Sequence, residues 1–312
     1  MKHSLIKNAQ NKMYPEFVNA FEPRKNKGGS EYGTLLSDLC YDRTYPNSYV
    51  DIYQTKADPD SKHPVAIYCH GGGYTWGDKA EGDPNAEGNG FYCFDELLKA
   101  GYQVVSVNYA LAPEYQYPVP LMQLNACVDW LLAHQEEYLL DMDQVIFMGG
   151  SAGAHLAGQF VNVVTNEAYA KRLGIISKLQ PDQVKAFVSQ SGLLDCERFD
   201  KTGSFAFDYI LRCCGRAYFE VKRLRGAEKV IESNVIENMT SAFPPCFISD
   251  GNEGTFTDQA QDLAKKAGQL SVPYVLKLYP RSEAKLGHGF EGGDTPQARE
   301  VRRMTLDFLK SL

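Results

Sequence analysis

Long apolar runs and dense positive charge are both scarce in this chain of 312 residues. No stretch approaches the roughly 20 apolar residues that a helix needs to cross a bilayer. The segment from Met1 to Asn8 has a positive residue but no apolar core of signal-peptide length, so we expect a cytoplasmic protein with no membrane span. The 39 acidic residues outnumber the 32 lysines and arginines, which gives a net charge of −7. This charge argues against a nucleic acid or an anionic membrane as partner.

Metal-binding and disulfide patterns are missing as well. The eight cysteines include no Cys-x-x-Cys pair, and no cluster of histidines lies near them. A zinc site and a disulfide framework are therefore not expected. Cys213 and Cys214 adjoin, which is a weak hint of redox activity. We expect no metal and no cofactor.

Short apolar runs alternate with helical patterns along most of the chain. Continuously apolar strands separated by helices indicate a parallel sheet that is covered on both faces. The expected fold class is therefore α/β. The expected strands are 48–53, 65–69, 103–109, 145–148, 184–190, 245–250 and 274–279, and the expected helices are 92–100, 121–134, 152–164, 257–268 and 296–312.

Two regions do not follow the alternation. Residues 1–45 are polar and rich in tyrosine, and we interpret them as an N-terminal arm or part of a lid beside a domain of residues 46–312. Residues 192–243 form a long aromatic-rich insertion between two strands. Such an insertion is typical of a lid that contacts the substrate, although an extra helix pair on the core would look the same.

The most informative motif is Gly149-Gly150-Ser151-Ala152-Gly153, which lies between an apolar strand and a helical run. A serine between small residues at a strand-to-helix turn is how a nucleophile elbow is built. The turn pushes the hydroxyl clear of the backbone. The N–H of Ala152 then lies at a helix N-terminus, where it can stabilise a developing oxyanion.

A second motif, His70-Gly71-Gly72-Gly73, directly follows the strand expected at 65–69. Consecutive glycines expose backbone N–H groups that can approach a substrate carbonyl. A phosphate-binding loop is the rival interpretation, but no Gly-Lys-Ser/Thr follows. A merely flexible loop is the other alternative.

A third segment, Asn108 to Glu114, followed by Tyr117-Pro118 and Trp130, completes a series of motifs in order. With it, the chain resembles the α/β-hydrolase esterases and lipases related to hormone-sensitive lipase and the bacterial carboxylesterases. The resemblance covers roughly residues 45–312. It implies an α/β-hydrolase fold, a mostly parallel central sheet and a lid-like insertion.

The resemblance also implies roles for particular residues. Ser151 would be the nucleophile that forms an acyl-enzyme. The oxyanion hole would consist of the N–H groups of Gly72, Gly73 and Ala152. His288, in Gly287-His288-Gly289 after the last strand, would be the general base.

The acid of the triad is where the sequence departs from the family pattern. The family places Asp three residues beyond a glycine at a strand end, and Gly254 occupies that position here. Glu253, one residue earlier, is the acid we expect first, and Asp250 at the strand end is the second candidate. Asp258 and Asp195 are further candidates, and a dyad without an acid is also conceivable. Gly150 and Gln123 stand where the lipase group often has Asp, which shifts the match toward smaller carboxylesterases.

The function implied is hydrolysis of small carboxylic esters, with short acyl or acetyl groups, by a carboxylic ester hydrolase that needs no cofactor. Acetylated sugars, short alkyl esters and aryl esters all fit a tyrosine-rich pocket. An amidase or peptidase of the same fold is the nearest alternative. A non-catalytic binding protein on this scaffold is the alternative from another class. The sequence does not decide whether the protein forms a homodimer.

Overall fold

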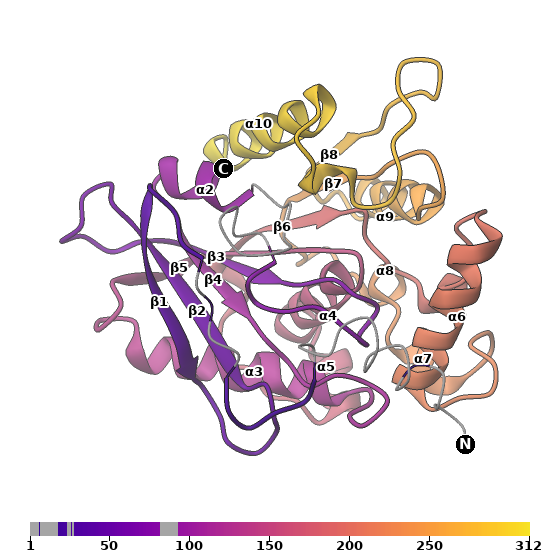
Figure 1. The fold of residues 1–312 in the computed structure, drawn as a ribbon, viewed down its shortest axis with the longest axis horizontal. Coiled ribbons are helices and arrows are strands. Elements are labelled where there is room, and N and C mark those ends of the chain that lie inside the picture. The colour runs from indigo at the N-terminus through magenta and orange to yellow at the C-terminus, as the bar shows by residue number, and fades with distance from the viewer. Residues whose placement is uncertain (1–5, 7–17, 24–25, 27, 82–92) are drawn as a thin grey trace.

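A central sheet of eight strands organises the molecule (Figure 1). The computed structural model describes residues 6, 18–23, 26, 28–81 and 93–312. Within them the strand order is β1-β2-β4-β3-β5-β6-β7-β8. The strands are β1 (Gly33–Cys40), β2 (Tyr49–Thr55), β3 (His63–Cys69), β4 (Gln103–Val107), β5 (Leu140–Gly150), β6 (Val184–Gln190), β7 (Cys246–Ser249) and β8 (Tyr274–Lys277).

The sheet is mostly parallel. Strands β4, β3, β5, β6, β7 and β8 pair in parallel, whereas β1 pairs with β2 and β2 with β4 in antiparallel fashion. This arrangement confirms the α/β class expected from the sequence. Because parallel strands share the same edge for their carboxyl ends, the loops after β3, β5, β7 and β8 are brought together there.

Side chains that alternate along each strand build one core on each face of the sheet. In β3, Val65 and Ile67 pack into one hydrophobic cluster and Ala66 and Tyr68 into the other. Helices α2 (Cys93–Lys99) and α10 (Pro296–Lys310) contribute to the second cluster. The first cluster is covered by α3 (Val119–His134), α4 (Ala152–Thr165) and α9 (Thr257–Gln269). Helices on both faces are thus confirmed.

The N-terminal region adds a strand that the sequence did not reveal. Residues 33–40 form β1 at the edge of the sheet, where most of its side chains are only half-buried. The pairing register shifts between Leu36 and Leu39, and Asp38 adopts a positive φ of 62°. This irregularity hides the alternation that would mark a strand. Residues 1–5, 7–17, 24–25 and 27 of the proposed arm lie outside the described residues, so a lid role there stays a prediction.

The insertion at 192–243 is largely helical. It contains α6 (Phe205–Phe219), α7 (Glu228–Glu232) and α8 (Val235–Asn238). Outside the insertion, the helix α5 (Glu167–Leu173) directly follows α4. Figure 1 shows α6 and α7 to one side of the sheet, at the right of the view. Phe207 and Leu211 of α6 line a cavity that Ser151 also lines. The lid-like role of the insertion stays a prediction. Within the described part of the chain, no helix has both the length and the apolarity that a membrane crossing requires.

Candidate active site

Ser151 occupies the sharp turn between β5 and α4. Its backbone has φ 54° and ψ −119°, a conformation that residues other than glycine adopt only under strain. The Ser151 N–H donates to the carbonyl oxygen of Gln190 at the end of β6, over 3.0 Å. The turn is thereby held by the neighbouring strand, and the serine side chain reaches the cavity at this edge of the sheet.

The glycines of the elbow differ in how much room they have. A Cβ on Gly153 would lie 2.0 Å from the carbonyl oxygen of Cys69, and one on Gly149 would lie 2.5 Å from the carbonyl carbon of Gly153. Close packing of α4 against β3 and β5 therefore requires glycine at both positions. A Cβ on Gly150 would have more room, because the nearest atom, the Tyr68 hydroxyl oxygen, would lie 3.8 Å away. A side chain is sterically allowed there.

The glycine loop after β3 is shaped by glycine-specific conformations. Gly72 and Gly73 have φ of 87° and 58°, and a Cβ on Gly72 would lie 2.1 Å from the carbonyl oxygen of Trp76. Among the described residues no acceptor binds the N–H groups of Gly72 and Gly73. The N–H of Gly71 instead donates to Oε2 of Glu81 over 2.9 Å. Two backbone donors are thus left for a ligand.

One cavity of about 220 Å³ joins these elements. Ser151, the glycine loop and His288 all line it, with Glu81 and Gln190 beside them. Its apolar wall comes from Trp76 and from Phe207 and Leu211 of α6. The tyrosine-rich pocket expected from the sequence is wrong for this cavity, since none of the described residues that line it is a tyrosine. Ala152, the third expected oxyanion donor, is the first residue of α4 and is fully buried next to Ser151.

His288 lies in the loop between β8 and a short 3₁₀ helix, η3 (Phe290–Gly292). Its ring packs between Phe207 and Phe256, with both ring centroids 5.3 Å away. The surrounding protein disfavours the charged imidazolium and lowers the pKa of His288 from 6.5 to about 4. The imidazole is therefore neutral near pH 7, as a general base must be.

The Nδ1 atom of His288 lies 3.0 Å from Oγ1 of Thr255, and this threonine hydroxyl donates to Oδ1 of Asp250 over 2.5 Å. Asp250 is fully buried, and its other oxygen, Oδ2, has no partner among the described residues. Burial, and then the negative charge of Glu291, raise the pKa of Asp250 to about 8. Thr255 was not singled out from the sequence, because a threonine after a strand has no distinctive pattern.

Glu291 fixes the histidine loop to the sheet. Its buried carboxylate accepts from the N–H of Ser191 at 3.0 Å, from the Ser191 hydroxyl at 2.7 Å and from the Ser249 hydroxyl at 2.8 Å. The Ser191 oxygen in turn accepts from the N–H of Gly289. Burial raises the pKa of Glu291. This residue was not expected from the sequence, where its one signal is a glutamate three positions after His288.

Glu253, the acid expected first, has another partner. Its Oε1 atom lies 2.5 Å from Nη2 of Arg281, and about half of its side chain is exposed. Glu253 does lie near the base, since it and His288 line a second, more open pocket.

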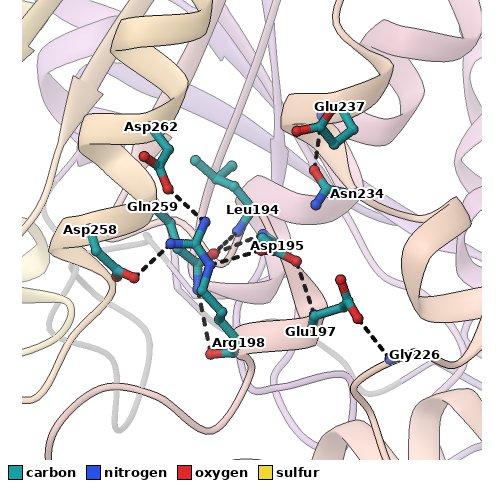
Figure 2. Close-up of polar contacts among 10 residues, drawn as sticks. All are labelled: Leu194, Asp195, Glu197, Arg198, Gly226, Asn234, Glu237, Asp258, Gln259 and Asp262. Carbon is teal, nitrogen blue, oxygen red and sulfur yellow. Dashed lines mark hydrogen bonds and ion pairs between the residues drawn. The ribbon is translucent and has the colours of Figure 1, made fainter.

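Asp195 and Asp258 are both paired with Arg198 (Figure 2). The guanidinium lies 2.8 Å from Asp195 and 2.7 Å from Asp258, and a third carboxylate, that of Asp262, lies 2.8 Å away. Asp195 also accepts from the N–H of Glu197 at the start of a short 3₁₀ helix. These contacts give both aspartates a structural explanation.

The described residues hold no group of three or more His, Cys, Asp or Glu side chains suited to a metal ion. Seven cysteines are described as free, Cys213 and Cys214 among them.

The sheet order, the strained serine after β5 and the histidine loop after β8 define the α/β-hydrolase class. The chain belongs to the BD-FAE family, whose sequence profile matches residues 50–266.

Individual relatives agree with this assignment. The chain is 24% identical over 291 residues to esterase LipQ of Mycobacterium tuberculosis (strain ATCC 25618 / H37Rv), a match that covers 89% of this chain and 62% of LipQ. The chain thus spans less than two thirds of the length of this relative. Among solved structures, esterase B of Lactobacillus rhamnosis (HN001) superposes with a TM-score of 0.72 at 18% identity, covering 98% of this chain and 91% of that one. The carboxylesterase EstE1, cloned from a metagenomic library, gives 0.69 at 18% identity over 91% and 90%.

Proposed function

We propose that the protein is a serine esterase that hydrolyses small carboxylic esters through an acyl-enzyme on Ser151. The observation that carries the proposal is the shared cavity. A strained serine, a neutral histidine and two backbone donors that bind no acceptor among the described residues all line the same space. The names of relatives such as esterase LipQ support the same reaction class.

In the first half of the proposed reaction, the Ser151 oxygen attacks the ester carbonyl carbon and its proton passes to Nε2 of His288. The N–H groups of Gly72, Gly73 and Ala152 stabilise the negative oxygen that forms. The C–O bond of the ester then breaks, and the leaving alcohol takes the proton from His288. In the second half, water attacks the acyl-enzyme by the same route, and Ser151 regains its proton as the carboxylic acid leaves.

The size of the cavity supports short acyl groups. A volume of about 220 Å³ is below the range of roughly 300–1,000 Å³ that holds drug-sized ligands. Esterase B of Lactobacillus rhamnosis, which shares the fold, has been solved with a C4-C4 tributyrin phosphonate inhibitor (TM-score 0.73 at 17% identity, covering 99% of this chain and 94% of that one). We therefore infer acetyl to butyryl esters as substrates.

The acid that assists His288 is a separate part of the proposal. Glu253 lies near His288 but is engaged by Arg281, whereas Asp250 reaches His288 through Thr255. Both carboxylates are candidates for the acid.

The test uses p-nitrophenyl acetate, butyrate and octanoate together with a fluorophosphonate probe. We expect turnover that falls with acyl length, and labelling of Ser151. Ser151→Ala and His288→Ala should each lower kcat by at least about a thousandfold. Ser61→Ala is the matched control, because Ser61 is an exposed serine bonded to Asp58 at the opposite end of β3 from the glycine loop.

Each alternative function has its own outcome. Faster cleavage of p-nitroanilides than of p-nitrophenyl esters would indicate an amidase or peptidase. Absence of both turnover and Ser151 labelling in the folded wild-type protein would instead indicate a non-catalytic binding protein.

A further inference from the structure

The partner of His288 is a hydroxyl group rather than a carboxylate. In a serine triad the acid usually accepts the Nδ1–H directly and so fixes the tautomer of the histidine. Here the Nδ1 atom faces Oγ1 of Thr255 at 3.0 Å, and the carboxylate of Asp250 lies on the far side of that hydroxyl.

The direction of these bonds follows from the donors around Oδ1 of Asp250. This oxygen accepts from both the Thr255 hydroxyl and the N–H of Gly251, so a proton held by Asp250 lies on Oδ2 and leaves the Thr255 bond in place. Thr255 has a single hydroxyl proton, which it donates to Asp250 over 2.5 Å. The Thr255 oxygen can then serve His288 only as an acceptor, so Nδ1 carries the hydrogen. The lone pair is left on Nε2, the nitrogen that takes the proton of Ser151 in the proposed reaction.

The surroundings make this chain of bonds well defined. Thr255 and Asp250 are buried, and both belong to the segment between β7 and α9. Oδ1 of Asp250 also accepts from the N–H of Gly251 at 2.6 Å. The Thr257 hydroxyl donates to the carbonyl oxygen of Gly251 and so fixes the same segment.

We propose that Thr255 is a positioning residue that connects His288 to Asp250, so that the triad acid acts on the base through an intervening hydroxyl. This inference rests on the proposed function. It assigns the acid to Asp250 rather than Glu253, whose carboxylate is held by Arg281. Loss of the aspartate three residues after Gly251 is then compensated by a threonine one position further on.

The test compares Thr255→Val, which removes the hydroxyl at nearly constant volume, with Thr255→Ser, which keeps it. We expect the valine variant to lose about a hundredfold in kcat on p-nitrophenyl acetate with KM within about twofold, since positioned general bases contribute factors of this size. The serine variant should recover activity to within about fivefold of wild type. Thr305→Val is the matched control, because it removes a buried hydroxyl from α10, where Oγ1 donates to the carbonyl oxygen of Val301 and not to a residue of the proposed site.

A double-variant cycle separates positioning from general damage. Asp250→Asn and Thr255→Val act on one chain of bonds, so the double variant should be hardly slower than the worse single variant. Glu253→Gln should lose less activity than Thr255→Val. Thermal unfolding of each variant is recorded alongside, and Thr255→Ala replaces the valine variant if the latter does not fold.

The proposal is overturned if Thr255→Ser is as slow as Thr255→Val, if the losses from Asp250→Asn and Thr255→Val multiply, or if Glu253→Gln is the most damaging of the three changes. All these outcomes require an active wild-type enzyme labelled at Ser151. An inactive and unlabelled wild type would be a failure of the proposed function instead.

Discussion

The carboxylate of Glu81 accepts a hydrogen bond from the N–H of Gly71 where the glycine loop leaves β3. Both Glu81 and Ser151 come within 3.6 Å of the point where a Cβ on Gly71 would lie. An acidic group therefore stands beside the proposed nucleophile. Its protonation state decides whether a negative charge faces the place where the oxyanion would form.

The first prediction concerns the pH dependence that Glu81 imposes. Burial, together with the nearby charge of Asp78, raises the pKa of Glu81 to about 7, although the Gly71 N–H opposes the shift. Above this pH the carboxylate is negative and repels the developing oxyanion. We expect Glu81→Gln to be faster than wild type at about pH 8.5, by roughly tenfold, because a charge a few ångströms away contributes about 1 kcal/mol or more.

The measurement is the ratio of kcat for Glu81→Gln to kcat for wild type between about pH 5 and pH 9. Glutamine can still accept from Gly71, so the loop geometry is retained. A ratio that stays flat across this range would contradict the prediction.

The second prediction is that Asp250 makes the protein less stable as the pH rises. The pKa of Asp250 is about 8 in the folded protein, against 3.8 for an ordinary Asp, because Asp250 is buried and faces Glu291 of η3. The hydrogen bonds from Thr255 and Gly251, on its own segment, lower the pKa but do not offset these two causes. Between these two pH values the folded state holds a proton that the unfolded chain has released. Stability therefore falls across this window as pH rises.

Asparagine has no carboxyl proton to lose in this pH range. The melting temperature of Asp250→Asn should therefore exceed that of wild type by an amount that grows from about pH 5 to about pH 8. Scanning calorimetry at several pH values provides the test, and a constant difference would show that ionisation of Asp250 is not the cause.

The third prediction compares Gly153, where an added Cβ would clash with the backbone, with Gly150, where there is room for one. Gly153→Ala should unfold the protein or lower its unfolding free energy by several kcal/mol, since backbone atoms of β3 would have to move. Gly150→Ala should change the melting temperature by only a few degrees. Chemical denaturation of both variants checks this, and equal destabilisation would mean that α4 is not closely packed on β3.

The fourth prediction concerns Asp258, one of the acids considered from the sequence. Because its carboxylate pairs with Arg198 and is half exposed, Asp258→Asn should keep kcat within about twofold and alter the unfolding free energy by less than about 1 kcal/mol. Esterase assays and urea unfolding test both statements. A large loss of kcat with unchanged stability would return Asp258 to the list of triad acids.

The parallel sheet was predictable because its central strands are buried on both sides and read as continuous apolar runs. Strand β6 was expected at 184–190 and occurs there, and α4 and α9 begin at the expected residues. Strand β1 was missed, since it lies at an edge and is interrupted by a register shift. Local hydrophobicity carries little information about such a strand.

In the candidate site, the sequence is most informative at the glycines, because the backbone conformation itself dictates that residue type. Turns and close contacts require glycine at 72, 73, 149 and 153, and these glycines can be recognised in the sequence. Thr255 and Glu291 act through contacts between loops that are distant along the chain, and Glu81 acts through a contact with Gly71 within the long connection after β3. No local pattern reports such contacts, and a buried carboxylate looks the same in a sequence as an exposed one.

The backbone of Ser151 is held in a conformation that serine does not favour by itself. The contacts that keep it there, from the N–H bond to Gln190 to the packing of Gly149 and Gly153, belong to the central sheet and α4. Folding free energy from the core is thus spent on exposing one hydroxyl group. A glycine at this position would relax the turn, so this is a point in the molecule where greater stability and the proposed chemistry exclude each other.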